Sequence, residues 1–503
     1  MKELAEKLFA FSTSARYVYW LSLELCILFS LAGLIFPQDI YTDVANVYAY
    51  YARELGNGNF AEGWVSRVPM LQILFAGGLA YLGLEAFKAC ILLSGFFYIL
   101  TVPVLRRYLE YFLTPLQAAW GCVLFVTAPK LIRYSISGML ESCRYFFLLA
   151  ALLCFFRVAK YLRKRDAVLL GLALGGLAVS RGEAVLFLPV LLGFLPFYIS
   201  LVQKDGLLKN LKRKALLTAL SVFFTVIAVS PFCFGNLKYA GYFVTDARLV
   251  ELMPKPTAQK AVKTAVPAVP AKQTSFAEKA GHALSELFRG GYEPYIVLGL
   301  LGMVLLLQRK WWRWEYSLLL AICLLHIAIY YKINSSLRYH LYAIPMLMPF
   351  TMTGIVFCIN SYMKWKARKP LTDILLCSVV AAVIVFQGIN GFERVINRKS
   401  WKRDAAEYLK EYNQKYFPGK RIRLADIGLA DVVYYSGAYR VCNYKRGRID
   451  FDKVNDFDLL LVARKKMSVL KRTDLVPVKH PFEDKFYLFT LTPKKKGIEI
   501  GKP

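Results

Sequence analysis

Long runs of apolar residues, separated by short basic segments, dominate this chain of 503 residues. A helix needs roughly 20 apolar residues to cross the hydrocarbon core of a bilayer, and shorter helices suffice inside a bundle. By this length rule the runs predict a polytopic α-helical membrane protein with about eleven spans. The predicted spans lie near residues 17–36, 88–105, 115–129, 142–159, 167–180, 184–202, 215–234, 293–308, 315–331, 340–360 and 371–388.

One further apolar segment, 69–86, decides the orientation of every later span. If it lies along the outer surface as a juxtamembrane helix, the basic clusters at 160–165, 204–214 and 364–369 all face the cytoplasm, as does the basic N-terminus. Cytoplasmic loops of membrane proteins carry an excess of Lys and Arg. We therefore expect that 69–86 does not cross, that the N-terminus is cytoplasmic and that the C-terminus lies outside.

This orientation sets the domain organisation. We expect a membrane domain over 1–391, with juxtamembrane helices in a first outer loop at 37–87 and a flexible, Pro-, Ala- and Lys-rich outer loop at 235–292. The segment 392–503 is long enough to fold as a small extracytoplasmic α/β domain. Its pattern predicts a helix near 400–415 and strands at 421–427, 457–463 and 485–491.

Composition supports a membrane protein and excludes other classes. Hydrophobic residues make up 57 % of the chain and charged residues 20 %, whereas soluble domains have roughly 45–50 % and about 25 %. A net charge of +31 could suit nucleic acid, but many Lys and Arg lie in short clusters between apolar runs, as topology signals do. The ten Cys form no CxxC pair and the four His are far apart. This argues against a disulfide framework and a Cys/His metal site.

Three acidic residues next to the membrane stand out, because such residues are costly unless they are used or solvated. Asp39 and Asp43 follow the first span, and Glu141 lies at the outer end of the fourth. Asp43 opens a stretch whose apolar positions, beginning with Tyr48, recur at helical spacing. Asp43 is either a first-turn anion of that helix or a general base close to the bilayer. Glu141 is either a solvated loop end or a second functional acid.

Three arginines, Arg67, Arg181 and Arg338, are expected on the outer side, against the trend that explains the other basic residues. Each binds either lipid headgroups or the phosphate of a lipid-linked substrate, since guanidinium forms bidentate hydrogen bonds to phosphate. Arg338 is followed by Tyr339 and His340 at the entrance of a span. His340 taken alone is either structural or catalytic.

The distribution of charge separates surface chemistry from transport. A carrier or lipid flippase would need ionisable residues along the middle of its spans. Here the central parts of the spans are almost free of them, with Glu24 as an exception, and the candidates gather at the outer ends. The pattern favours chemistry on a lipid substrate, and a polytopic transporter with an extracytoplasmic domain is the alternative.

The order of these segments resembles the GT-C superfamily of membrane glycosyltransferases, in particular the branch of the protein O-mannosyltransferases and the aminoarabinose transferases of lipid A. The resemblance covers the membrane part, and the tail is similar only in position and general type. It rests on the outer loop with Asp43, on Glu141, and on four segments. These are RVPML (67–71), GLALGGLAVSRGEAVLFLP (171–189), SPFCFGNLKYAGYFVTDARL (230–249) and LRYHLYAIPML (337–347).

The resemblance implies an inverting transfer of a hexosyl or pentosyl group from a polyprenyl-phosphate donor to an acceptor outside the cytoplasm. It implies Asp43 as the base or acceptor-orienting group and Glu141 as the second acid. The usual Asp-Glu pair is absent, because Val44 follows Asp43. Asp39 is therefore the alternative base, with Tyr48 as an additional site residue.

The resemblance also implies a phosphate-binding set on the donor side. Arg67 and the Arg338–Tyr339 pair match the basic positions of the family. Arg181 joins this set from its expected place on the outer side, and His340 is a possible additional site residue. The family's Pro-Pro-Leu element reads Val68-Pro69-Met70 in this chain.

The implied reaction requires no cofactor and no dedicated metal site, and a divalent ion that bridges carboxylate and phosphate stays open. The expected partners are the lipid-linked sugar, membrane lipids and an acceptor that is lipid A, a protein or an envelope glycan, with no nucleic acid. We expect a bacterial inner-membrane protein that uses undecaprenyl phosphate as the carrier, with its C-terminal domain in the periplasm.

Overall fold

The computed structural model describes most of the chain and divides it into two units. The described residues are 14–36, 43–66, 68–241, 243–245, 292–332, 340–365, 401–419, 422–427, 429–440, 458–464 and 475–491, with a few positions between 281 and 289. Unit 1 comprises Met1–Phe36, Val68–Gln72 and Cys90–Ile396, and unit 2 comprises Pro37–Arg67, Ile73–Ala89 and Asn397–Pro503. The predicted span 371–388 lies outside the described residues.

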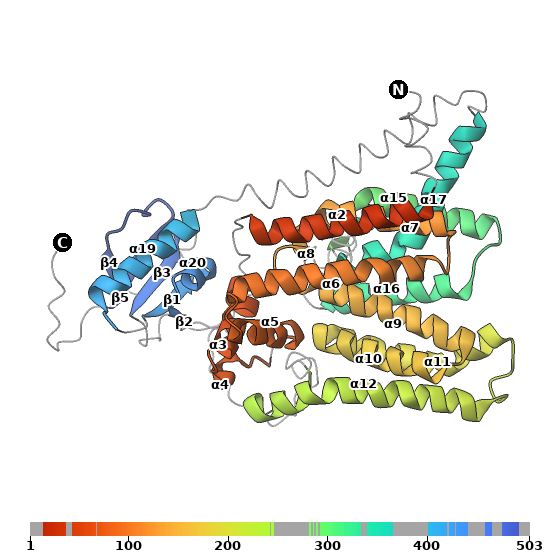
Figure 1. Cartoon of the computed structure of the whole chain (residues 1–503), viewed down its shortest axis with the longest axis horizontal. Coiled ribbons are helices and arrows are strands. Elements are labelled where there is room, and N and C mark those ends of the chain that lie inside the picture. Colours follow the sequence, from red (N-terminus) through yellow and green to blue (C-terminus); the bar gives the residue numbers. More distant parts are fainter. Residues whose placement is uncertain are drawn as a thin grey trace. The chain divides into compact units, whose positions relative to one another are not determined.

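Unit 1 is built from long apolar helices, several of which run lengthwise beside one another (Figure 1). Each predicted span from 17–36 to 340–360 coincides with a helix. The elements are α2 (Ala15–Ile35), α6 (Ala86–Leu109), α7 (Pro115–Thr127), α8 (Pro129–Ser135), α9 (Glu141–Tyr161), α10 (Lys164–Ser180), η2 (Gly182–Leu186), α11 (Phe187–Gln203), α12 (Leu211–Ala240), α15 (Glu293–Gln308), α16 (Trp314–Lys332) and α17 (Ala343–Trp365).

The predicted number of eleven spans is not confirmed. Among the described residues, five helices are long and apolar enough to cross a membrane, and a sixth if the bent pair α7–α8 is one span. The predicted number is larger than the observed one because the sequence prediction includes apolar runs as short as 167–180, which suffice only inside a bundle. Helices such as α15 are apolar but have 16 residues, about 24 Å at 1.5 Å per residue, which is less than the roughly 30 Å of hydrocarbon.

Local sequence signals explain how the bent pair begins and bends. Thr114 accepts a hydrogen bond from the backbone N–H of Gln117, whose side chain accepts one from the backbone N–H of Thr114, and Pro115 occupies the first turn. This capping box fixes the start of α7. Pro129 begins α8, and the two helices meet at an angle of 63°. A proline lacks the N–H that would continue the preceding helix, so the break falls where the sequence places it.

Small residues let neighbouring helices approach closely. A Cβ atom on Gly171 of α10 would collide with the backbone carbonyl oxygen of Ser221 on α12. Across the same contact, Thr225 donates to the carbonyl of Gly171 at 3.1 Å and Ser221 donates to that of Ala167 at 3.1 Å. Close small-residue contacts joined by hydroxyl hydrogen bonds are typical of membrane helix pairs.

The helices α15 and α17 also approach closely at glycines and are joined by a hydroxyl hydrogen bond. A Cβ atom on Gly302 would collide with the carbonyl oxygen of Phe350, and one on Gly354 with that of Leu298. Thr351 of α17 donates to the carbonyl of Tyr295 at 2.9 Å. The contact therefore depends on glycine at both helices.

The short basic connections gather at one end of unit 1, which we call the basic end. Arg313 before α16 donates to the carbonyl of Tyr111 after α6 at 2.8 Å. Gln203 at the end of α11 donates to the carbonyl of Ala159 near the end of α9 at 2.6 Å, and Arg213 in α12 reaches that of Leu162 at 3.2 Å. The opposite end of unit 1 therefore holds the start of α9, the end of α10 and the start of α17.

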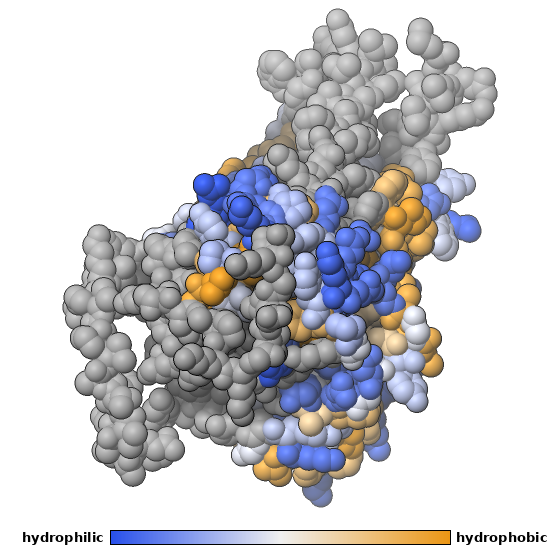
Figure 2. Space-filling model, turned by 90° about the vertical axis from the view of Figure 1, so that its left-hand side faces the viewer, coloured by the Kyte–Doolittle hydropathy of each residue, from blue (hydrophilic) through white to orange (hydrophobic). Residues whose placement is uncertain are grey.

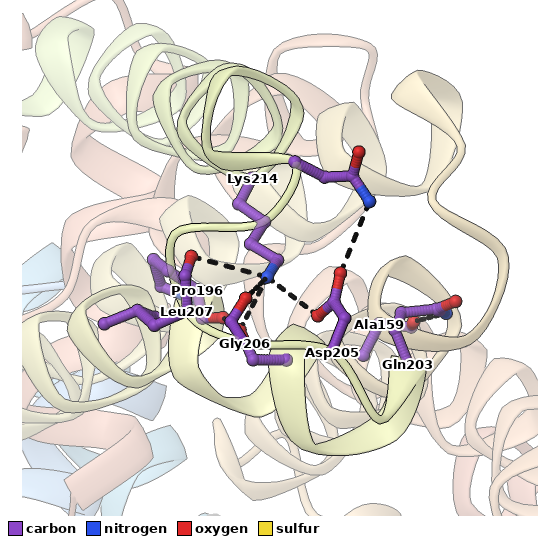
Figure 3. Close-up of polar contacts among 9 residues, drawn as sticks. Ala159, Pro196, Gln203, Asp205, Gly206, Leu207 and Lys214 are labelled. Atoms are coloured by element: carbon purple, nitrogen blue, oxygen red, sulfur yellow. Dashed lines mark hydrogen bonds and ion pairs between the residues drawn. The ribbon is translucent and has the colours of Figure 1, made fainter.

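A buried lysine closes one of these connections (Figure 3). Lys214 is 1 % exposed, and its ammonium group donates to Ser200 Oγ at 2.7 Å, Asp205 Oδ1 at 2.8 Å and the carbonyl of Gly206 at 2.9 Å. The hydrogen bond from Lys214 lowers the pKa of the Asp205 carboxyl below its usual range. Because every proton of the ammonium has an acceptor, its burial is compensated.

The surface of the described residues combines polar and apolar regions. The face in Figure 2 shows mainly hydrophilic described residues, with hydrophobic ones toward its margins. Along the helices, large apolar side chains are exposed, such as Leu31 at 50 %, Val226 at 59 % and Leu324 at 66 %. Such exposure along apolar helices fits contact with lipid rather than water.

Unit 2 contains the small sheet that the tail sequence predicts. The strands are β1 (Arg423–Ile427), β2 (Tyr439–Arg440), β3 (Leu459–Ala463), β4 (Leu475–Val478) and β5 (Phe486–Leu491), in the order β2-β1-β3-β5-β4. Strands β2, β1 and β3 are parallel, with Leu424 opposite Leu459, and β5 is antiparallel to β3 and β4. Helices α19 (Trp401–Tyr416) and α20 (Ala430–Tyr435) share its core. The predicted helix and three strands are confirmed, whereas β2 and β4 were not predicted.

The first loop packs with the tail inside unit 2. It forms η1 (Val44–Tyr48), α3 (Ala49–Gly56), α4 (Phe60–Gly63) and α5 (Leu71–Tyr81). Arg53 of α3 donates to the carbonyls of Tyr434 at 3.1 Å and Ala438 at 3.4 Å. At 11 residues, α5 is about 16 Å long, half the thickness of the hydrocarbon. That length fits the prediction that 69–86 does not cross.

Candidate functional site

The end of unit 1 opposite the basic end contains a group of buried polar side chains. Glu141 is the first residue of α9, Arg181 follows the last residue of α10, and His326 lies in the second half of α16. We call the following residues the buried polar cluster. They are Glu141, Arg144, Tyr145, Arg181, His326, His340 and Tyr342, and all are at most 5 % exposed.

One half of the cluster is an ion pair between two helix ends. Arg181 Nη1 lies 3.9 Å from Glu141 Oε1, and the two side chains are 6 % and 3 % exposed. The carboxylate is at the N-terminus of α9 and the guanidinium at the C-terminus of α10, where the helix dipoles favour those charges. The arrangement keeps both charges away from water. From the sequence alone, Glu141 is either a solvated loop end or a second functional acid. That solvated interpretation is wrong.

The other half is centred on Arg144, one turn further along α9. Arg144 has only donors, so its Nη2 donates to Nδ1 of His326 at 3.1 Å. Its guanidinium lies 5.1 Å from the ring centroid of Tyr342, whose ring is 3.7 Å from that of His326. His340 lies 5.8 Å from His326, ring to ring. The Arg144 contact fixes the neutral imidazole of His326 with its proton on Nε2.

Tyr145 connects the two halves, because it interacts electrostatically with Glu141, Arg144 and Arg181. Its hydroxyl and Glu141 Oε2 are both buried and have no hydrogen-bond partner among the described residues. Buried polar atoms in folded proteins are nearly always hydrogen-bonded, to protein or to water or ligand. A free acceptor and a free hydroxyl beside two guanidinium groups are therefore ready to bind a polar group.

The cluster combines two guanidinium groups, a carboxylate, two imidazoles and two phenols. Burial of a charge costs several kcal/mol per ion, and a low-dielectric site makes each remaining electrostatic interaction stronger. Guanidinium donors in such a site suit a phosphate, whose oxygens accept bidentate hydrogen bonds. The carboxylate suits a hydroxyl donor. The cluster therefore contains the chemical groups that bind a phosphate and a hydroxyl.

The architecture is similar to that of a solved structure. The apo crystal structure of ArnT from Cupriavidus metallidurans matches with a TM-score of 0.63 and 13 % identity, over 93 % of this chain and 97 % of that chain. The chain has the ArnT fold.

Two further structures match less closely. ArnT from C. metallidurans bound to undecaprenyl phosphate matches with a TM-score of 0.46 and 12 % identity, over 96 % of this chain and 98 % of that one. The protein O-mannosyltransferase Pmt1–Pmt2 complex of S. cerevisiae, bound to the sugar donor, matches with a TM-score of 0.38 and 15 % identity, over 46 % and 36 %. No protein-family model and no curated protein matches the sequence.

The match to ArnT confirms, at the level of the fold, the resemblance that the order of sequence segments predicts. At 13 % identity, however, the likeness establishes the architecture alone. The same fold can carry different activities, so function has to be argued from the residues of the site.

Three of the predicted site residues meet within this ArnT-like fold. Glu141 and Arg181 form the ion pair, and His340 joins them through His326 and Arg144. Four others lie outside the described residues. They are Asp39, Arg67, Arg338 and Tyr339.

Asp43 and Tyr48 belong to unit 2. Asp43 precedes the π-helix η1, is partly exposed, and makes no side-chain capping hydrogen bond among the described residues. Tyr48 is buried, as its position on the apolar side of the predicted helix requires. Short π-helical turns occur often at functional sites.

Sequence reasoning missed Arg144, Tyr145, His326 and Tyr342. The sequence contains a signal for Arg144 and another for His326. Arg144 follows Glu141 by three residues, so both lie on one side of a helix, and His326 is an isolated polar residue in an apolar helix, which is a sign of function in membrane proteins. No local signal distinguishes Tyr145 from the other tyrosines of the chain.

The part of the chain that the structure describes contains no group of three or more His, Cys, Asp or Glu side chains that could hold a metal ion. Large cavities lie elsewhere, with one of about 710 Å³ among the helix ends at the basic end. The buried polar cluster is therefore identified by its charge and its free polar atoms.

Proposed function

We propose that this chain is an inverting glycosyltransferase of the membrane, which moves a sugar from a polyprenyl-phosphate donor to an extracytoplasmic acceptor. The proposal rests on the buried polar cluster and is supported by the ArnT fold that covers 93 % of the chain. The sugar is a hexose or a pentose, and the acceptor is lipid A, a protein or an envelope glycan.

A single observation carries the proposal. Glu141 Oε2 and the Tyr145 hydroxyl are buried without a hydrogen-bond partner among the described residues, beside the guanidinium of Arg181. A buried carboxylate oxygen without a donor is expensive to keep. A ligand that brings a hydroxyl to Glu141 and phosphate oxygens to the arginine would satisfy these atoms together. A glycosyl phosphate carries both groups on adjacent atoms.

The proposed reaction is one displacement at the anomeric carbon. The acceptor oxygen forms a bond to that carbon, the bond from the carbon to the phosphate oxygen breaks, and polyprenyl phosphate leaves with the bonding electron pair. The proton of the acceptor hydroxyl passes to a carboxylate. Because negative charge grows on the phosphate, prearranged guanidinium groups stabilise the transition state more than the ground state.

Within this scheme Arg181 and Arg144 bind the donor phosphate, and Glu141 holds a hydroxyl of the sugar or acceptor. Asp43 is the proposed base from its position in the sequence, with Asp39 as the alternative. A carboxylate base contributes typically about 10²–10⁴-fold.

The remaining assignments come from the sequence alone. Arg67, Arg338 and Tyr339 add to the phosphate-binding set, and Tyr48 supports the helix that Asp43 begins. The proposed location is a bacterial inner membrane, with the basic end of unit 1 toward the cytoplasm and undecaprenyl phosphate as the natural carrier.

Donor turnover separates this proposal from transport. Purified protein in detergent, incubated with a radiolabelled polyprenyl-phosphate-linked sugar and an acceptor such as lipid A, should release free polyprenyl phosphate. A transporter would instead accumulate the labelled lipid or sugar across a vesicle membrane without cleaving it. Accumulation without release, with every candidate acceptor, would contradict the proposal.

A further inference from the structure

The basic end of unit 1 holds a pocket that the proposed reaction does not use. It has a volume of about 710 Å³ and lies among the ends of α6, α9 and α11 and the start of α16. The buried polar cluster is at the other end of α9, since Glu141 begins that helix and Lys160 is next to its last residue. A 21-residue helix is about 31 Å long, so the two sites are separate.

The pocket carries an excess of positive charge. Five basic and three acidic side chains line the pocket or form ion pairs with its lining. They are Arg106, Arg107, Arg157, Lys160 and Arg313, against Glu110, Asp166 and Glu315. Each acid is held by an arginine at 2.9 or 3.0 Å. The pocket therefore retains a surplus of two positive charges.

Lys160 and Arg107 provide the accessible part of this charge. Lys160 is exposed, and its ammonium group, among the described residues, has only ring contacts, at 5.6 Å from the centroid of Tyr111 and 5.3 Å from that of Tyr161. The Arg107 side chain is 72 % exposed, and its weaker contact to Glu110 is 3.3 Å long. The Tyr111 hydroxyl is buried without a hydrogen-bond partner among the described residues. These groups together form a donor set for an anion.

The lining changes from polar to apolar with depth. Phe156 and Tyr198 are buried and form the aromatic floor, with ring centroids 6.1 Å apart, and Leu153 lies one turn of α9 deeper than Arg157. A ligand with a charged group and an adjoining apolar part matches such a lining. Basic pockets between membrane helices on the cytoplasmic side bind the headgroups of anionic lipids.

We propose that this pocket binds the phosphate headgroup of an anionic membrane lipid, with the lipid's glycerol and first methylenes against the aromatic floor. The site is independent of sugar transfer. It anchors α6, α9, α11 and α16 to one leaflet, so bound lipid is expected to stabilise unit 1.

The test uses the full-length protein in detergent and native mass spectrometry with diphosphatidylglycerol as the probe. Wild type is expected to bind it saturably and more tightly than phosphatidylcholine. The double variant Arg107→Gln/Lys160→Gln is expected to bind it about 25-fold more weakly, since each basic side chain near a headgroup contributes about fivefold. Both residues are surface-exposed, so the fold and the sugar transfer should be unaffected.

Lys164→Gln/Lys212→Gln is the matched control, because both lysines are exposed at the basic end outside the pocket. It removes the same charge and should bind diphosphatidylglycerol like wild type. Equal weakening in the two double variants would overturn the site, since the effect would then be bulk charge. If inorganic phosphate at millimolar concentration displaced the lipid completely, the ligand would be a soluble phosphate and the lipid proposal would be wrong.

Discussion

Asp43→Asn is expected to reduce kcat for sugar transfer by about 10²–10⁴-fold, while KM for the lipid-linked donor changes little. The amide has nearly the same shape as the carboxylate but cannot take the proton of the acceptor hydroxyl. Donor binding depends mainly on the guanidinium groups, so the loss should be in kcat. Initial rates of polyprenyl phosphate release, over a range of donor concentrations, give both constants.

Two matched variants make this result specific. Glu62→Gln removes another carboxylate from the same outer loop, in α4, and should leave kcat unchanged. Asp39→Asn tests the alternative base: a larger loss there than in Asp43→Asn would move the assignment to Asp39. Turnover of Asp43→Asn within about threefold of wild type would refute a role for Asp43 as base, given the size of such contributions.

Arg181→Gln is expected to reduce kcat/KM for the donor by about 10²–10³-fold, because it removes a positive charge from the leaving phosphate. Both kcat and KM should be affected, since the guanidinium binds the phosphate before and during the reaction. Arg181→Lys should recover only part of the activity, as an ammonium lacks the bidentate geometry.

The substitution also leaves Glu141 buried without its ion-pair partner, which typically costs 3–5 kcal/mol of stability. The double variant Arg181→Gln/Glu141→Gln removes both charges and avoids that penalty. If it unfolds at the wild-type temperature and remains inactive, the loss reflects chemistry. If Arg181→Gln keeps activity within threefold of wild type, Arg181 does not contact the donor phosphate.

The sequence was sufficient for the helices of the membrane part, because a helix surrounded by lipid or by other apolar helices needs an apolar run and little else. The spans 142–159 and 215–234, for example, correspond to α9 and α12. The number of helices that cross the membrane was harder to predict. A helix of 16 residues such as α15 is long enough to pack inside a bundle but too short to cross a bilayer by itself. In the tail, β4 was missed because Pro477 is unfavourable in strands away from an edge, and β4 is at the edge of the sheet.

The candidate site was only partly predictable for a different reason. Glu141 and Arg181 are charged residues at helix ends, and this can be recognised in one dimension. The contact of Arg144 with His326 joins positions 182 residues apart, and only the packing of α9 near α16 and α17 brings them together. The same holds in unit 2, where Arg53 binds a carbonyl 381 residues away. Such contacts depend on tertiary structure, which a single sequence does not display.

The central claim is that the buried polar cluster binds the phosphate of a polyprenyl carrier. Equilibrium binding of radiolabelled undecaprenyl phosphate to the purified full-length protein tests it most directly, with Arg181→Gln/Glu141→Gln compared with the surface control Lys212→Gln. We expect wild type and Lys212→Gln to bind equally, and the cluster variant to bind at least tenfold more weakly. Equal affinity in all three proteins would place the phosphate elsewhere and contradict the claim.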